Sequence, residues 1–155
     1  MLRNKITKRR FLQFFALALL VAAGMVAWSV IRTIGEIPEA YAAWDTGTLL
    51  TTYLDQNDGK WPSGWDDLAT VINEHEPMLF SRSDEHGERM SDADYIAKLR
   101  SMVDVDWTYQ PGPDNAASPV TRADGGVFRT VWTGAEPNEM VRSFIAHQSK
   151  PQNGG

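Results

Sequence analysis

The sequence predicts an α+β protein in which a long N-terminal transmembrane helix continues into a small domain of short helices and a small antiparallel sheet. Three observations predict this class. Residues 11–31 carry no charged side chain. The following stretch, residues 32–54, begins with apolar residues spaced three and four apart, as on one face of a helix. Residues 103–109 alternate apolar and polar side chains, which is typical of a half-buried strand.

The apolar run at 11–31 is long enough to cross a bilayer. At a rise of about 1.5 Å per residue it reaches about 30 Å, the thickness of the hydrocarbon core. A cleaved signal peptide is the alternative, because Ala40, Tyr41 and Ala42 have the small-x-small form of a cleavage site. The run is longer than a signal peptide's apolar region, and this site lies well beyond its end. We therefore expect an uncleaved single-pass anchor.

The basic residues predict the orientation of this anchor. Residues 1–10 contain five of them: Arg3, Lys5, Lys8, Arg9 and Arg10. After the run comes Arg32, and the next basic residue is Lys60. The positive-inside rule then places residues 1–10 in the cytoplasm, as a basic cytoplasmic segment. Residues 36–155 are expected on the periplasmic or extracellular side of the cytoplasmic membrane.

Charge and cysteine content exclude several kinds of partner and chemistry. All 20 acidic residues lie in residues 36–155, together with nine lysines and arginines, which gives this part a net charge of −11. Such a surface repels nucleic acid, so no nucleic-acid partner is expected. The chain has no cysteine, which excludes disulfides, thiolate catalysis and cysteine-ligated metals. No cofactor is predicted.

Residues 32–54 are expected to form an amphipathic helix that emerges from the membrane. Gly35 and Pro38 predict a kink or a restart within it, since proline is tolerated in a first helical turn. The apolar residues at helical spacing form a candidate helix-packing interface: Ile34, Ile37, Tyr41 and Trp44.

Residues 55–148 are expected to form the α+β domain, followed by a flexible tail at 149–155. Ser63–Asp66 and Ser91–Asp94 both have the S-x-x-D form of a capping box and predict two helix starts. The first helix should end before Pro77. A last helix over residues 136–148 is expected to bury four side chains: Met140, Val141, Phe144 and Ile145.

Two strands should form the sheet of this domain. Residues 103–109 give the first strand, and residues 127–133 are expected to give the second. Between them lies a long stretch rich in proline, glycine and asparagine, which predicts a loop. The two strands should then pair antiparallel across that loop.

The stretch YLDQNDGKWPSGWDDL, residues 53–68, has the composition of an ion site or a carboxylate cluster. Against a calcium loop, its glycine comes one residue too early and Lys60 follows it. Against paired acid/base catalysis, Asp66 and Asp67 are neighbours in a helix and diverge by about 100°. We interpret the stretch as a turn junction, with no catalytic and no metal-binding residue assigned. Its residues are Tyr53, Asn57, Gly59, Trp61, Pro62 and Trp65.

The histidines and the remaining tryptophans leave two alternatives open. His75 and His86 each lie among carboxylates, which suits a divalent ion, but no two histidines have metal-site spacing. We expect both to be solvated loop residues. The tryptophans outside the apolar run would form a ligand platform if exposed together, and packing in the core is the favoured interpretation.

At the turn junction the sequence resembles type IV pilins and type II secretion pseudopilins. The resemblance covers roughly residues 1–70: a basic leader, an apolar helix, an amphipathic continuation, then Tyr53, Asn57–Gly59, Trp61 and Pro62. It implies a pilin-like fold. The prepilin peptidase motif is absent, because Arg10 and Phe15 stand where that family has glycine and glutamate. The resemblance therefore implies a pilin-like protein kept in the membrane.

These observations predict a structural or accessory component of a pseudopilus, secretion or surface-assembly system. It would act through contacts with other membrane or secretion-system proteins, or with copies of itself. The alternative is a membrane-tethered domain that binds or senses a ligand through its acidic surface. No nucleophile or nucleotide-binding motif supports an enzyme.

The mass of the mature protein tests the anchor. We expect an N-terminus near Met1 by intact mass spectrometry of the membrane fraction. A start at Phe11 would instead indicate prepilin-type processing, and a start at Ala43 would make the protein soluble and secreted.

Overall fold

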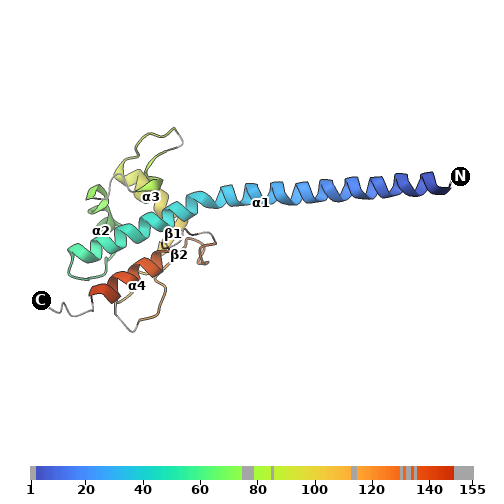
Figure 1. Cartoon of the computed structure of the whole chain (residues 1–155). Coiled ribbons are helices and arrows are strands. Elements are labelled where there is room, and N and C mark those ends of the chain that lie inside the picture. Colours follow the sequence, from blue (N-terminus) through green and yellow to red (C-terminus); the bar gives the residue numbers. More distant parts are fainter. Residues whose placement is uncertain are drawn as a thin grey trace, which may run out of the picture. The chain divides into compact units, whose positions relative to one another are not determined.

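The computed structural model describes residues 3–74, 79–84, 86–112, 115–129, 131, 134 and 136–148 (Figure 1). The chain divides into two compact units, Met1–Glu36 and Ile37–Gly155, which we describe separately. The described elements, with η for 3₁₀ helices, are in chain order α1 (Arg3–Gln56), α2 (Trp65–Ala69), η1 (Ile72–Glu74), η2 (Phe80–Arg82), α3 (Asp92–Met102), β1 (Val103–Val105), β2 (Val120–Arg122) and α4 (Pro137–Gln148). The predicted α+β class, with one long apolar N-terminal helix, short helices and a two-stranded antiparallel sheet, is confirmed.

Helix α1 contains 54 residues and runs through Gly35 and Pro38 without interruption. Of the two expected possibilities, a restart at Pro38 is therefore excluded, and a kink there stays a prediction. Proline removes one backbone hydrogen bond, but strong helix formers follow it at Ala40, Ala42 and Ala43, and all three are buried. In the first unit, by contrast, the apolar side chains of α1 are exposed around the helix, from Phe14 at 72% to Ile34 at 59%.

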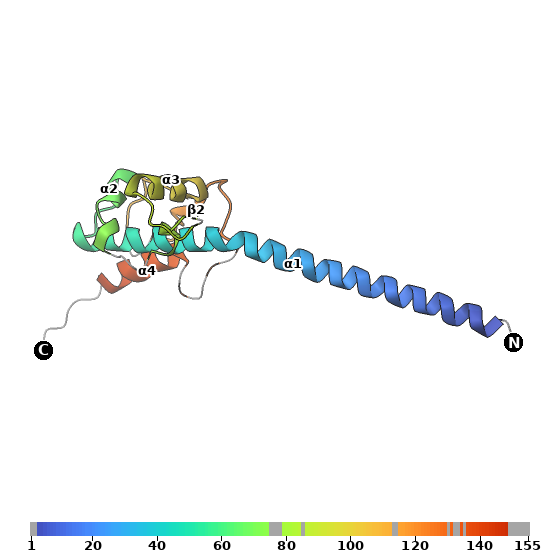
Figure 2. The ribbon, with the colours of Figure 1, turned by 90° about the horizontal axis from the view of Figure 1, so that it is seen from above.

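The core of the second unit forms around the C-terminal part of α1. Leu49, Leu50 and Leu54 are fully buried there, together with residues of α2, α3, α4 and both strands. Figure 2 shows α3 and α4 on opposite sides of this part of α1. Gly47 is the point of closest approach to α4: a Cβ at this position would lie 3.0 Å from the Cα of Pro137 and 2.7 Å from the sulfur of Met140. Only glycine fits this crossing without displacing backbone.

The two predicted capping boxes have different outcomes. At α3 the box is confirmed, because the Ser91 hydroxyl accepts from the Asp94 N–H at 3.2 Å. At α2 the partner is Asp67 rather than Asp66: the N–H and the hydroxyl of Ser63 both donate to Asp67 Oδ2, at 2.7 and 2.8 Å. Helix α2 begins at Trp65, one residue later than a box with Asp66 requires, and it is only five residues long.

The sheet is smaller than expected, and its second strand is elsewhere. Strand β1 ends at Val105, because the Asp106 carboxylate accepts from both the N–H and the hydroxyl of Thr108 and turns the chain. Its antiparallel partner is β2, with Val105 opposite Val120 and Val103 opposite Arg122. The strand expected at 127–133 is wrong for its described residues: 127–129 and 131 lie outside any strand, and Val127 is 82% exposed.

Helix α4 ends at Gln148, as predicted. It buries Val141 completely, and Met140, Phe144 and Ile145 are half-buried. Its first turn also closes the free edge of the sheet. Asn138, which is 5% exposed, accepts from the Val120 N–H at 2.9 Å and donates to the Val120 carbonyl at 2.8 Å. The amide side chain thus satisfies both backbone groups of a strand residue, as a neighbouring strand would.

Replacing this amide tests its role. Asn138→Ala leaves the Val120 N–H and C=O buried without their partner, so the free energy of unfolding should fall by about 2–4 kcal/mol. The measurement is denaturant unfolding of the full chain in detergent, followed by tryptophan fluorescence. Glu139→Ala, at the next and exposed position, is the control and should change stability by less than about 0.5 kcal/mol. Equal effects of the two substitutions would contradict the edge-closing role.

Candidate functional site

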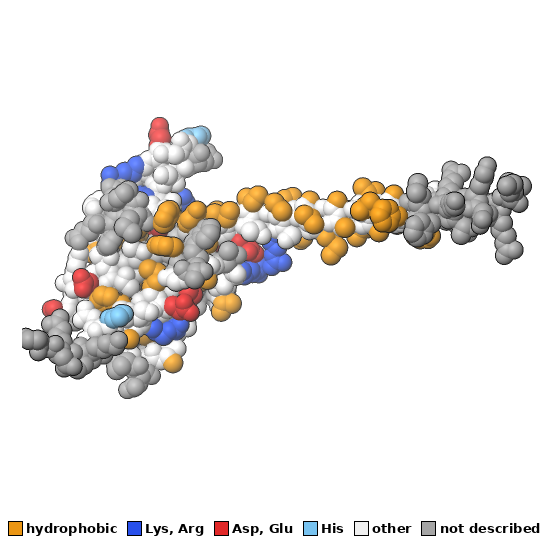
Figure 3. All heavy atoms as spheres, in the orientation of Figure 1, with side chains coloured by type: hydrophobic (Ala, Val, Ile, Leu, Met, Phe, Trp, Pro, Cys, Tyr) orange, Lys and Arg blue, Asp and Glu red, His pale blue; other side chains and the backbone are white. Residues whose placement is uncertain are grey.

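Helix α1 carries the strongest functional feature of the first unit. Among the described residues, one helix is long and apolar enough to cross a membrane, by length and composition: Gln13–Gln56, near the N-terminus. None of its most apolar 18-residue stretch is buried. Figure 3 shows hydrophobic side chains over much of this described surface. Free apolar surface of this extent is what a lipid environment accommodates.

In the second unit, three aromatic side chains meet at the surface, and we call them the aromatic cluster: Tyr41, Trp44 and Phe80. The ring centroids of Tyr41 and Phe80 are 5.3 Å apart and stacked, and those of Trp44 and Phe80 are 5.5 Å apart, edge to face. Phe80 is 53% exposed. Two members of the predicted helix-packing interface thus lie together, with a third ring that the sequence did not identify.

Of the other two residues in that predicted interface, Ile37 is half-buried in the second unit and Ile34 is exposed in the first. Whether all four form one contact surface stays a prediction. The cluster differs from a bare helix face, because Phe80 comes from η2, far away in the sequence.

Asp45 follows Trp44 in α1 and is fully buried. Its Oδ1 accepts from the Phe80 N–H at 2.9 Å, and its Oδ2 accepts from the Ser81 N–H at 2.7 Å and the Tyr95 hydroxyl at 2.9 Å. Burial raises the pKa of Asp45, while these hydrogen bonds act in the opposite direction. Burial and the neighbouring Asp45 also raise the pKa of Tyr95. The carboxylate joins α1, η2 and α3.

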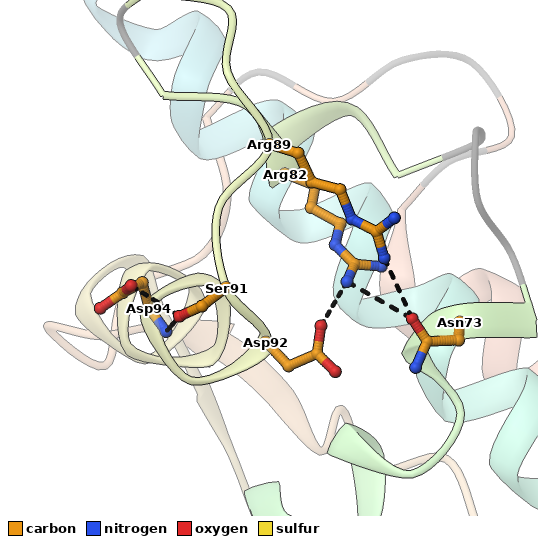
Figure 4. Close-up of polar contacts among 6 residues, drawn as sticks. All are labelled: Asn73, Arg82, Arg89, Ser91, Asp92 and Asp94. Atoms are coloured by element: carbon orange, nitrogen blue, oxygen red, sulfur yellow. Dashed lines mark hydrogen bonds and ion pairs between the residues drawn. The ribbon is translucent and has the colours of Figure 1, made fainter.

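Other charged side chains hold the same 3₁₀ helix from α3. Lys98 donates to the carbonyls of Ser81 at 2.8 Å and Ser83 at 3.0 Å. The buried Arg82 pairs with Asp92, and Figure 4 shows its guanidinium beside that of Arg89, with both directed at the Asn73 amide oxygen. Helix η2, and with it Phe80, is therefore fixed through both its backbone and its side chains.

The predicted turn junction forms the expected left-handed turn. Asp58 and Gly59 have φ of 54° and 75°, and the Gly59 N–H donates to the Leu54 carbonyl at 2.8 Å. Asn57 bonds the Tyr53 carbonyl through its backbone N–H and its side chain, at 3.0 and 2.9 Å. These bonds satisfy carbonyls that the end of α1 would otherwise leave open.

The tryptophans of the junction contact the segment that follows β1. The Trp61 indole donates to the Asp106 carbonyl at 2.9 Å, and its ring lies edge-on to Tyr109 with centroids 4.8 Å apart. Trp65 lies edge-on to Trp107 at 5.4 Å. The junction, in which Pro62 is also buried, is thus pinned to the segment after β1.

The carboxylates of the junction act locally. Two hydrogen bonds from Ser63 hold the pKa of Asp67 below its ordinary value. Slight burial and the nearby Asp67 raise the pKa of Tyr53. Tyr53 and Asp67, which come from opposite ends of the junction, are therefore close in space. This is the arrangement of a helix cap and not of two carboxyl groups sharing a proton.

The described residues form no cluster that could hold a metal ion. Within the ranges that the structure describes, no three His, Asp or Glu side chains come together as a metal site would require. His86 is exposed, with its backbone N–H bonded to Asp84 Oδ1 at 2.9 Å. His75, Pro77 and the predicted tail at 149–155 lie outside the described residues.

The alternative cleavage site at 40–42 lies within α1. Ala40 is 1% exposed and Ala42 is 0% exposed, so these residues are buried in the second unit.

Sequence reasoning missed Asp45, Phe80 and Asn138. One signal was available for the first: Asp45 interrupts an otherwise apolar and small-residue run, from Ala42 to Leu50, on a predicted helix. Phe80 and Asn138 carry no such signal, because their partners are distant in the sequence.

Comparison of the chain with protein-family models, with curated proteins and with solved structures gave no match.

The buried carboxylate predicts a pH dependence. Because its folded-state pKa is raised, the protonated form of Asp45 is favoured by folding, and its contribution to stability declines as pH rises from 3.8 through the folded-state pKa. Asp45→Asn cannot titrate, so the free energy of unfolding of the parent minus that of the variant should decrease over this range. Unfolding curves at a series of pH values measure it, with exposed Asp55→Asn as control. A difference that grows with pH would mean that the three hydrogen bonds outweigh burial.

Proposed function

We propose that this protein is a single-pass membrane protein with an exported domain, serving as a structural or accessory component of an export or surface-assembly system. The observation that carries the proposal is the exposed apolar stretch of α1, which continues in sequence into the helix that organises a folded domain.

The contacts of the second unit support a protein–protein role rather than catalysis. Its three-ring aromatic cluster is partly exposed and rigidly held, as in interaction surfaces, where aromatic side chains are enriched. The titratable groups with shifted pKa, such as Asp45 and Asp67, have structural partners. We propose the face of Ile34, Ile37, Tyr41 and Trp44 as the contact surface.

The pilin-like interpretation gives the kind of system. The order of leader, apolar helix, amphipathic continuation and turn junction supports it, as does a domain that packs on the end of the long helix. The absence of the prepilin peptidase motif favours an accessory that stays in the membrane over a filament subunit. The N-terminus lies in the cytoplasm and the domain in the periplasm or outside the cell.

Single cysteines test the contact surface cleanly, since the chain has none of its own. With a photoactivatable maleimide in native membranes, Ile37→Cys should give protein adducts several times more abundantly than Gly35→Cys. Two residues apart on a helix, these side chains point about 200° apart at nearly the same depth. A cysteine is also sterically free at position 35, where an added Cβ meets nothing within 4 Å.

Two results would count against the proposal. A protein released from membranes by alkaline carbonate would not be an integral anchor. A monomeric protein with equally low adduct yields at both positions would have no contact surface on this face.

A further inference from the structure

The outer end of the apolar stretch carries a small polar and aromatic group that the contact surface does not include. It consists of Trp28, Ile31, Arg32 and Glu36, all within the first unit. Trp28 is 71% exposed and Ile31 is 66% exposed, and together with Arg32 they line a hollow of about 190 Å³ with an apolar surface. Ile31 and Arg32 lie three and four positions after Trp28, so the three side chains share one face of the helix, and the hollow opens on that face.

An ion pair lies directly beyond the hollow. The Arg32 Nε donates to Glu36 Oε1 at 3.2 Å, and the Arg32 side chain is 59% exposed. The Glu36 side chain is 20% exposed, so the pair is accessible mainly from its Arg32 side. The polar neighbour Thr33 is satisfied within the helix, with its hydroxyl bonded to the Ser29 carbonyl at 3.0 Å.

The order of these groups along the helix is aromatic and apolar, then cationic, then anionic. Arg32 lies about 6 Å beyond Trp28, and Glu36 about 6 Å beyond Arg32. The headgroup layer of a bilayer is about 5–7 Å thick on each side. Because the Arg32 guanidinium and the Glu36 carboxylate meet at 3.2 Å, a hollow at the edge of the hydrocarbon places both charged groups in the headgroup layer, the arginine nearer the hollow.

Resting on the proposed membrane anchoring, we infer that this hollow binds a zwitterionic phospholipid whose headgroup ends in a primary ammonium. Its acyl chain packs against Trp28 and Ile31, its phosphate binds the Arg32 guanidinium, and its ammonium binds the Glu36 carboxylate. Charge complementarity selects this headgroup: an anionic lipid such as phosphatidylglycerol places no cation beside Glu36, and a quaternary ammonium has no N–H to donate.

Trp28 provides the readout for a test with the full-length protein in vesicles. Lipids brominated on the acyl chain quench nearby tryptophan, and subtracting the signal of Trp28→Phe isolates this residue. Brominated phosphatidylethanolamine in a phosphatidylcholine background should associate with the Trp28 site roughly two- to fivefold more strongly than brominated phosphatidylcholine in the reverse mixture, the range for one exposed ion pair. Phosphatidylglycerol should show no such advantage.

Two variants distinguish lipid binding from a role in the helix. Exchanging the charges, with Arg32→Glu and Glu36→Arg together, keeps an i, i+4 pair but reverses its order, and it should abolish the preference. Thr33→Ala lies at the same depth, keeps both charges and should retain the preference.

The outcomes are separable. Equal quenching of Trp28 by all three lipids, a preference for phosphatidylglycerol or phosphatidylcholine, or a preference that survives the charge exchange would overturn the inference and leave the anchor standing. Failure of every brominated lipid to quench Trp28 would overturn the inference and membrane anchoring together.

Discussion

The burial of the Asp45 carboxylate is the constraint on which the second unit depends. A charged group without solvent is costly unless donors surround it, and here the donors come from two backbone N–H groups of η2 and one hydroxyl of α3. Those donors must be brought to α1, so the carboxylate dictates where η2 and α3 lie. The exposed ring of Phe80 is a consequence, since its own N–H is one of the three.

A single helix meets two different demands in its two halves. From Phe14 to Ile34 its large apolar side chains are exposed, and beyond residue 37 it becomes the centre of a core with Leu49, Leu50 and Leu54. In the second region Gly47 lies where α4 approaches closely. Proline at position 38 is accommodated between these regions.

Local signals predicted most of the elements, and non-local pairing accounts for the errors. The long helix, the Ser91 cap and α4 follow from periodicity and capping within a few residues. The alternation of apolar and polar residues predicts a strand but not its partner, so the strand expected at 127–133 is wrong. The partner of β1 is Val120–Arg122, which Asn138 also holds. Of the candidate site, Tyr41 and Trp44 were predicted. Phe80 and Asp45 required the tertiary contacts.

The amide of Asn138 has a consequence for the protein's behaviour among other chains. A two-stranded sheet has two edges, and an open edge is a template on which a foreign strand can add. With both backbone groups of Val120 occupied by a side chain of its own α4, that position offers no hydrogen bonds to a passing extended segment. In a domain without disulfides, the β2 edge is in this way guarded at Val120 against the addition of a foreign strand.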